Sequence, residues 1–217
     1  MNILFQGDSI TDANREKVHL LDNYNLGSGY VTMVAAHLTM KRNDIVIHNR
    51  GISGNRTEQI AARWQEDTLS MDYDVLSLLC GINDIGFDIR MGVCGDRAFV
   101  EPIYDKMLYQ AREKNPDAPI ILMTPFIFKR YRNDPTFGSD IYDNYDLWHE
   151  RTVVAGEMVK DMAKKYSTEL IPLFDIFKEE MKSRPAEEFS PDCVHPTAMG
   201  HAIIAREWLK TFEKLGL

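Results

Sequence analysis

The sequence predicts an α/β fold in which helices cover both faces of a parallel five-stranded sheet. Short apolar runs of strand character alternate with longer stretches of helical period along the chain. Such alternation implies right-handed crossovers, which place helices on both sides of a parallel sheet. The chain has 217 residues, 44% of them hydrophobic, and no break in composition divides it, so we expect a single domain over residues 1–217.

The strands are predicted from five short apolar runs. These runs lie at residues 3–5, 45–47, 75–79, 120–123 and 170–173. Two segments have no regular pattern, residues 85–97 and residues 128–145, and they follow the third and fourth strands. Loops of this length in a compact domain are usually functional or disordered. Because both segments follow strands of the same parallel sheet, we expect them at one edge of that sheet.

The helices are predicted from apolar side chains at helical spacing. Positions 30, 33, 34, 37 and 38 form one stripe after Gly29. Asn55 and Glu58 resemble a capping box that opens a helix through Trp64. A later helix aligns Val154, Met158 and Met162 at four-residue spacing. The last helix, at residues 197–212, carries Ile204, Trp208 and Phe212 on one face.

Composition argues against several classes of protein. The net charge of −8 disfavours nucleic-acid and anionic-membrane surfaces, and the longest basic clusters, at 41–42 and 129–132, are short. No segment reaches the roughly 20 apolar residues that span a bilayer. Cys80, Cys94 and Cys193 have neither an even count nor metal-ligand spacing. Together with an amino terminus that lacks a signal-peptide pattern, they predict a cytoplasmic protein.

Polar side chains and glycines follow several of the predicted strands. "FQGDSITD" places Ser9 after the first strand, "NRGISGN" places Gly54 after the second, and "GIND" places Asn83 after the third. "SPDCVHPTAMGH" supplies Asp192 and His195 beyond the fifth strand. In open parallel sheets, ligands bind at the carboxyl ends of the strands, so we expect these residues to share one site.

These five residues offer the groups that acyl transfer by a serine requires. A serine hydroxyl needs a base, a group that orients the base, and donors for the developing oxyanion. His195 can accept the proton of Ser9, and Asp192 can fix the tautomer of His195. The backbone N–H groups of Ser9 and Gly54 and the amide of Asn83 can hold the oxyanion. Each residue alone is more often a turn, cap or surface residue, and only the ordered set favours catalysis.

The same segments resemble, in order and spacing, the SGNH or GDSL-like hydrolases, which are named for their Ser, Gly, Asn and His. The resemblance covers the whole chain. It implies that Ser9 is the nucleophile, that Gly54 and Asn83 line the oxyanion hole with Ser9, and that Asp192 and His195 complete the triad. It also implies a flavodoxin-like three-layer α/β/α fold, no metal and no other cofactor.

Further segments are similar to the intracellular acetyl xylan esterases of that family. They are "LGSGYVTMVAAHL", "ARWQEDTLS", "GINDI", "LMTPF" and "VHPTAMGHAIIA". This similarity implies a serine esterase that removes acetyl groups from acetylated xylo-oligosaccharides or related small sugars through an acyl-enzyme intermediate. It also suggests a homo-oligomer, since relatives often self-associate. The chain departs from those enzymes at Pro191 and Cys193, so the similarity does not define the acyl-side pocket.

Substrate-binding residues are expected at the mouth of the site. Arg15 is one candidate, although a solvated helix charge explains it equally well. Phe126 and Tyr131 belong to an aromatic cluster after the fourth strand, which suits a carbohydrate-binding rim, a lid or a subunit contact. The other members of this cluster are Phe128, Phe137, Tyr142, Tyr145 and Trp148. The acidic net charge favours a neutral acetylated sugar over a polyanion or an anionic lipid surface.

Three alternatives stay open on sequence grounds. The chain could be a broader short-chain acyl esterase, or a lysophospholipase or thioesterase. It could be a flavodoxin-like binder of nucleotide or flavin, although GxGxxG and P-loop motifs are absent. It could also be an interaction subunit that lost catalysis, which the intact set of Ser9, Asp192 and His195 disfavours. His201 lies six residues after His195, so we expect it to point away from the site.

Overall fold

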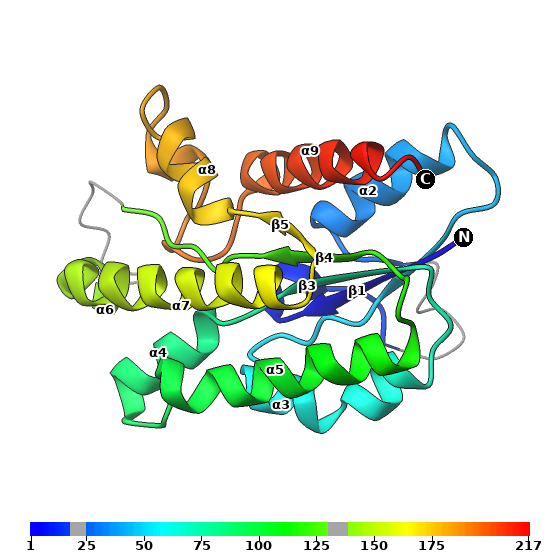
Figure 1. Cartoon of the computed structure of the whole chain (residues 1–217). Helices are drawn as coiled ribbons and strands as arrows, with labels where there is room; N and C mark the ends of the chain where they lie inside the picture. Colours follow the sequence, from blue (N-terminus) through cyan, green and yellow to red (C-terminus); the bar gives the residue numbers. More distant parts are fainter. Residues whose placement is uncertain (18–24, 130–138) are drawn as a thin grey trace.

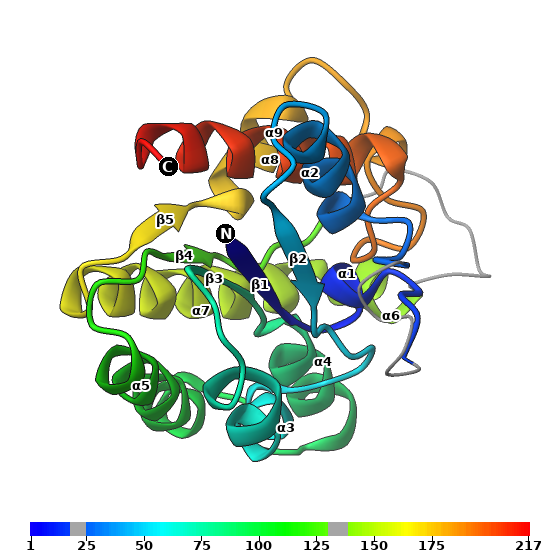
Figure 2. The same ribbon diagram turned by 90° about the vertical axis from the view of Figure 1, so that its right-hand side faces the viewer.

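The sheet is parallel and five-stranded, as predicted. The structure is a computed structural model that describes residues 1–17, 25–129 and 139–217. Within these residues the strands are ordered β2-β1-β3-β4-β5 (Figures 1 and 2), and every pairing is parallel. The strands are β1 (Asn2–Gly7), β2 (Val46–Asn49), β3 (Val75–Leu79), β4 (Ile120–Met123) and β5 (Glu169–Ile171).

Helices cover both faces of this sheet and complete the three-layer α/β/α arrangement. Figure 2 shows α2 (Tyr30–Thr39), α8 (Leu173–Glu180) and α9 (Ala198–Lys214) on one face, and α3 (Thr57–Ala62) and α5 (Arg97–Lys114) on the other. The other α-helices are α1 (Ser9–Asp12), α4 (Ile82–Met91), α6 (Ser139–Asp143) and α7 (Tyr145–Lys165). Among the described residues, no helix combines the length and apolar character needed to cross a membrane.

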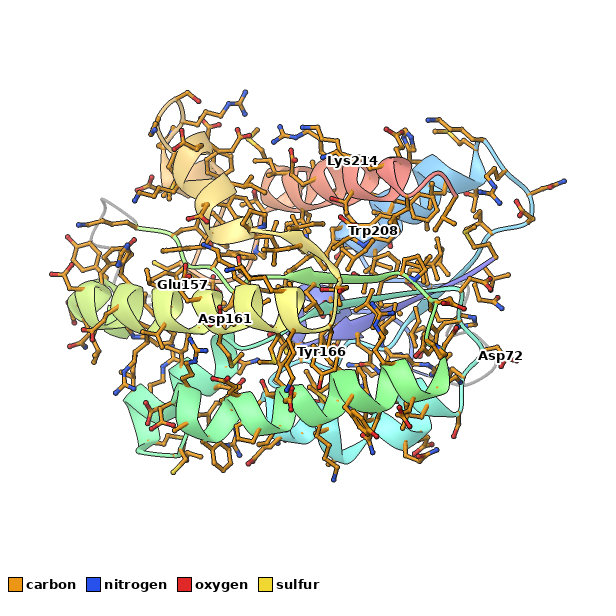
Figure 3. The ribbon with its side chains drawn as sticks, viewed as in Figure 1. Asp72, Glu157, Asp161, Tyr166, Trp208 and Lys214 are labelled. Carbon is orange, nitrogen blue, oxygen red and sulfur yellow. The ribbon has the colours of Figure 1, made fainter. Side chains whose placement is uncertain are left out.

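Two apolar cores fill the spaces between the layers, because successive side chains of a strand point to opposite faces. Ile3 and Phe5 of β1 lie in the core beneath α2, α8 and α9, whereas Leu4 lies in the core shared with α3, α5 and α7. Trp208 is fully buried on the side of α9 that faces the sheet (Figure 3). Its Nε1 donates a hydrogen bond of 3.0 Å to Ser77 Oγ in β3, which satisfies both polar groups.

The predicted strand bounds are confirmed for β3 and β4 and differ slightly elsewhere. β2 runs from Val46 to Asn49 rather than over residues 45–47. β5 ends at Ile171, and Leu173, which was predicted as strand, begins α8. Pro172 stands between them, and because proline has no backbone N–H it cannot continue the sheet pairing.

The helix predicted from Asn55 starts later than expected. α3 begins at Thr57, and the backbone N–H of Arg56 donates to Oε1 of Gln59 at 2.9 Å. The capping contact is therefore formed by Arg56 and Gln59, one residue beyond the predicted pair of Asn55 and Glu58. A π-helical turn, Gln65–Leu69, follows α3 after Arg63 and Trp64.

The prediction that residues 85–97 are irregular is wrong for the first half of that segment. Ile82–Met91 form α4, which ends at Gly92 with a φ of 64°. Gly86 lies inside this helix, where an added Cβ would approach the ring of Trp148 to 3.0 Å. The glycine therefore permits close packing of α4 on α7 rather than a turn.

The helical stripes are confirmed in part. Ile204, Trp208 and Phe212 are all buried in α9, as predicted. In α7, Met158 and Met162 are buried, but Val154 is 40% exposed. The buried face of α7 also uses Trp148, Thr152 and Gly156, and the last two have little or no apolar character, which concealed the stripe in the sequence.

Candidate active site

β1 leads into α1 through a tight turn. Gly7 is the last residue of the strand, Asp8 is the N-cap, and Ser9 is the first residue of the helix. A Cβ at Gly7 would lie 2.3 Å from Thr11 Oγ1 and 2.5 Å from the carbonyl oxygen of Leu79. Only glycine allows this approach, so the turn holds Ser9 at the carboxyl end of the sheet.

Three side chains form a hydrogen-bonded chain at this edge. Ser9 Oγ lies 2.9 Å from His195 Nε2, and His195 Nδ1 lies 2.5 Å from Asp192 Oδ2. The other oxygen of Asp192, Oδ1, accepts from the backbone N–H groups of His195 at 2.7 Å and Val194 at 3.0 Å, and from Ser190 Oγ at 3.2 Å. Because Oδ2 faces Nδ1, it favours the tautomer in which Nδ1 carries the proton and Nε2 accepts.

The pKa values of His195 and Asp192 move in opposite directions. The hydrogen bond that His195 donates to Asp192 raises the pKa of His195 above its usual 6.5, against the opposing effect of burial. Burial alone would raise the pKa of Asp192, but the hydrogen bonds from His195 and Val194 outweigh it and lower that pKa to about 2. An ionised Asp192 stabilises the imidazolium that forms when His195 accepts a proton.

The loop after β2 is hydrogen-bonded to the segments that follow β1 and β3. The backbone N–H of Ile52 donates to the carbonyl oxygen of Gly7 at 3.1 Å. Nδ2 of Asn83, in the first turn of α4, donates to the carbonyl oxygen of Asn55 at 3.0 Å. These bonds fix the loop that carries Gly54, whose φ is 81°. Residues other than glycine rarely adopt this conformation.

Hydrogen-bond donors are available on the same edge. Among the described residues, the backbone N–H groups of Ser9 and Gly54 donate to no protein acceptor. Asn83 uses one of its two amide protons on Asn55 and keeps the other. The arrangement therefore offers two backbone donors and one side-chain donor to an anion.

Two carboxyl groups are buried beneath this edge. Asp84 accepts from the backbone N–H of Thr57 at 3.0 Å and from its hydroxyl at 2.9 Å, and burial raises the pKa of Asp84 to about 6. Asp8 is fully buried, and burial raises its pKa to about 7 although the N–H of Ile10 donates to its Oδ1. Its Oδ2 has no partner among the described residues. Both carboxyl groups titrate closer to neutral pH than an exposed aspartate does.

Ser9 and His195 line a hollow together with mainly small or polar residues. The other residues of its wall are Ile10, Ala13, Asn14, Ser28, Ser53, Pro196, Ala198 and His201. The prediction that His201 points away from the site is wrong, because α9 begins only at Ala198, after His195. Nδ1 of His201 accepts from the backbone N–H of Tyr30 at 3.2 Å, and burial lowers the pKa of His201 to about 4.

The structure does not bring the predicted substrate-binding residues to this hollow. Arg15 is buried, and its Nε donates to the carbonyl oxygen of Gly51 at 2.7 Å, so it is neither solvated nor open. Phe126 is fully buried, with its ring centroid 4.7 Å from that of Phe177, and it has no face open to a ligand. Tyr131 lies outside the described residues.

The remaining members of the predicted aromatic cluster do not form one rim. Phe128 and Trp148 are buried in the core, and Phe137 lies outside the described residues. Tyr142 and Tyr145 line a second hollow together with Lys129, Asp143, Asn144, Asp146, Leu147 and Cys193. Part of the segment predicted as irregular, residues 139–143, forms α6.

Sequence reasoning missed several residues that hold the site in place. Ser190 supports Asp192, and its position two residues before that carboxylate is a local turn signal. Asp12 accepts from the backbone N–H of Ser53 at 2.8 Å and ties α1 to the loop that carries Gly54. Within the part of the chain that the structure describes, no group of three or more His, Cys, Asp or Glu residues is placed to hold a metal ion.

Comparisons with known proteins agree with this geometry. The profile of the GDSL-like Lipase/Acylhydrolase family matches residues 5–203. An acetylxylan esterase from Geobacillus stearothermophilus is 31% identical over 213 residues, which cover 96% of this chain and 92% of the relative.

Solved structures give the same result. Axe2, an acetylxylan esterase from Geobacillus stearothermophilus, superposes with a TM-score of 0.80 at 28% identity, covering 97% of this chain and 93% of Axe2. Variants of Axe2 that lack a serine, an aspartate or a histidine are described as catalytic mutants, and another is described as an acetyl-xylooligosaccharide esterase. A GDSL-like lipase from Parabacteroides merdae gives a TM-score of 0.79 at 31% identity, covering 97% and 94%. The chain therefore belongs to the GDSL-like lipase/acylhydrolase family and is a carboxylic-ester hydrolase.

Proposed function

We propose that this protein is a serine esterase that removes acetyl groups from acetylated xylo-oligosaccharides or related small sugars. In this proposal Ser9 is the nucleophile, His195 is the general base and acid, and Asp192 orients His195. The observation that carries the proposal is the hydrogen-bonded chain from Ser9 through His195 to Asp192, with contacts of 2.9 and 2.5 Å.

The first half of the reaction forms an acetyl-enzyme. Ser9 Oγ attacks the carbonyl carbon of the acetyl ester while His195 Nε2 takes the hydroxyl proton. The negative charge that develops on the carbonyl oxygen is held by the N–H groups of Ser9 and Gly54 and by Nδ2 of Asn83. The bond between the acetyl carbon and the sugar oxygen then breaks, and His195 returns the proton to that oxygen, which leaves as a sugar hydroxyl.

The second half releases acetate by the same steps with water in place of the serine. His195 accepts a proton from a water molecule, and the resulting hydroxide attacks the acetyl carbon. The bond to Ser9 Oγ breaks, and His195 returns the proton to the serine. Throughout, the ionised Asp192, with its pKa of about 2, offsets the positive charge on His195.

The choice of substrate rests on three observations. The hollow at Ser9 is lined by small side chains such as Ala13, Ser28 and Ser53, which suits a short acyl group and a hydroxyl-rich alcohol. Axe2 and the curated relative are acetylxylan esterases, and both match nearly the whole chain. The net charge of −8 suits a neutral sugar better than an anionic lipid surface.

The test compares three substrates with the protein and its Ser9→Ala variant. Acetate release from acetylated xylo-oligosaccharides is measured beside hydrolysis of an octanoyl ester and of a lysophospholipid. We expect acetate release to dominate and to vanish in the variant, whose fold should persist. Preference for the longer chains would favour a broader acyl esterase or a lysophospholipase or thioesterase. Near-normal activity in Ser9→Ala would refute the assignment of the nucleophile.

Two further predictions accompany the proposal. A cytoplasmic location is supported by Cys80, Cys94 and Cys193, which form no disulfide with one another, since disulfides are rare in reducing compartments. Self-association stays a prediction, and size-exclusion chromatography with light scattering measures it directly.

A further inference from the structure

Arg63 is a charged side chain that the proposed chemistry does not use, yet it lies against the segments that carry that chemistry. It follows α3 directly as the C-cap, and its side chain is only 14% exposed. Nη2 donates to the carbonyl oxygen of Gly7 at 3.1 Å, and Nη1 donates to that of Arg50 at 2.8 Å. Nε donates to Oδ1 of Asn55 at 2.8 Å. One guanidinium therefore joins the end of β1 to both sides of the loop that carries Gly54.

The contact with Asn55 extends this network to the oxyanion donors. The carbonyl oxygen of Asn55 accepts from Nδ2 of Asn83, so the residue that Arg63 holds also orients the Asn83 amide. The contact with Gly7 fixes the carbonyl two residues before Ser9. All three segments that supply the donors for the oxyanion are thus within one or two hydrogen bonds of Arg63.

The other side of the guanidinium is anchored by a buried polar cluster. Nη1 donates to Oε1 of Gln6 and to Oδ2 of Asp67, both at 2.9 Å. Gln6 is fully buried in β1, and its Nε2 donates to the carbonyl oxygen of Asp67 and to Thr68 Oγ1. Asp67 and Thr68 belong to the π-helical turn, an element that is frequent near functional sites. Both polar side-chain atoms of Gln6 are hydrogen-bonded, and fully satisfied buried networks of this kind favour a single arrangement.

We propose that Arg63 is a positioning residue that sets the spacing of the three oxyanion donors. Its planar fork holds Gly7, Arg50 and Asn55 at fixed distances, which lysine, with one ammonium group, cannot reproduce. Transition-state stabilisation depends on donors placed where the charge develops, so a small shift of these loops lowers kcat more than KM. The inference rests on the proposed function, since it concerns the same oxyanion.

The test compares Arg63→Gln with a matched control, Arg112→Gln. Arg112 also donates five hydrogen bonds, all to backbone carbonyls near the amino ends of β4 and β5, away from Ser9. Both variants are expected to lower the melting temperature. On p-nitrophenyl acetate, which has no sugar, we expect Arg63→Gln to lower kcat by about 10- to 100-fold with little change in KM. Arg112→Gln is expected to retain kcat within about twofold.

A double-mutant cycle with Asn83→Ala separates positioning from general destabilisation. If Arg63 acts through Asn83, Arg63→Gln lowers kcat by a factor at least about threefold smaller in the Asn83→Ala background than in the unchanged protein. Arg63→Lys, expected to have an intermediate kcat, serves if Arg63→Gln does not fold. The inference would be overturned by a kcat for Arg63→Gln equal to that of Arg112→Gln. It would also be overturned if the factors by which Arg63→Gln and Asn83→Ala each lower kcat simply multiply in the double variant. Hydrolysis that persists in Ser9→Ala would instead refute the proposed function, so the two failures are distinguishable.

Discussion

Replacing Asp192 with asparagine tests the proposed triad most directly, because the two carboxylate oxygens have different partners. Oδ1 accepts three hydrogen bonds, from the N–H groups of Val194 and His195 and from Ser190 Oγ. Among the described residues, Oδ2 accepts from His195 Nδ1 alone, at 2.5 Å. An asparagine has one oxygen, and the three donors hold it at the Oδ1 position. Its amide NH₂ group, which cannot accept, then faces Nδ1 of His195.

This orientation forces the wrong tautomer on His195. Nδ1 must accept from the new amide, so the proton moves to Nε2, which then donates to Ser9 Oγ and cannot take its proton. We expect kcat at neutral pH to fall by about 10³- to 10⁴-fold, which corresponds to about 4–5.5 kcal/mol of transition-state stabilisation. Loss of the carboxylate, with its pKa of about 2, is also expected to lower the free energy of unfolding at neutral pH by about 2 kcal/mol.

The pH dependence gives a second readout. The proposed mechanism requires neutral His195. We therefore expect kcat/KM of the unchanged protein to rise with pH through a midpoint above 6.5, because Asp192 raises the pKa of His195. In Asp192→Asn that midpoint is expected to fall. The assay is acetate release measured from about pH 5 to about pH 9. Ser190→Ala, which removes one neutral donor to Oδ1, is the control and should retain kcat within about threefold.

The reasoning is refuted if Asp192→Asn keeps more than about a tenth of kcat at neutral pH, or if its midpoint is unchanged while the protein is folded.

Two other substitutions test the glycine donor and the buried carboxyl. Gly54→Ala and Gly92→Ala both add a Cβ at positive φ, 81° and 64°, with no atom within 4 Å, so each should cost about 1 kcal/mol of stability. Only Gly54→Ala should lower kcat, by about tenfold, because it shifts a proposed oxyanion donor, and equal kcat values in the two variants would contradict that role. Asp8 of the folded protein, with a pKa of about 7, stays protonated at pH values where Asp8 of the unfolded chain ionises, so the unchanged protein loses stability as pH rises from about 4 to about 7. Asp8→Asn has no such group, and its free energy of unfolding should therefore gain about 3–4 kcal/mol relative to the unchanged protein over this range. Urea unfolding at both ends of this range measures the difference, and a pH-independent difference would count against the buried carboxyl.

Apolar periodicity was enough to predict the layers of the fold. Fully buried strands such as β3 and β4 are continuous apolar runs, so their bounds can be seen directly in the sequence. Periodicity failed for α4, where Gly86 serves helix packing, and for the buried face of α7, where Thr152 and Gly156 replace apolar residues. In both helices the tertiary neighbour decides the residue, and a single sequence does not contain that neighbour.

The residues around Ser9 were harder to predict for a related reason. In "ARWQED", Arg63 and Asp67 have the spacing of an exposed ion pair on a helix. The pair does form, at 2.9 Å, but the π-helical turn directs it inward against Gln6. Arg15 is likewise buried by a contact with the loop after β2 that no local pattern specifies.

The buried polar residues themselves mark the site. Gln6 and Asp8 follow the apolar start of β1, and Asp84 lies just beyond β3, where a core alone would favour apolar side chains. Burying a polar group without a partner costs about 1–3 kcal/mol, and Gln6 and Asp84 avoid that cost through their hydrogen bonds. Asp8 Oδ2 does not avoid it. Local departures from a well-packed apolar pattern are expected at functional sites, and these three residues all lie at the edge that holds Ser9. Polar residues that directly follow apolar strands are therefore a usable sequence criterion for such an edge, because packing alone does not explain them.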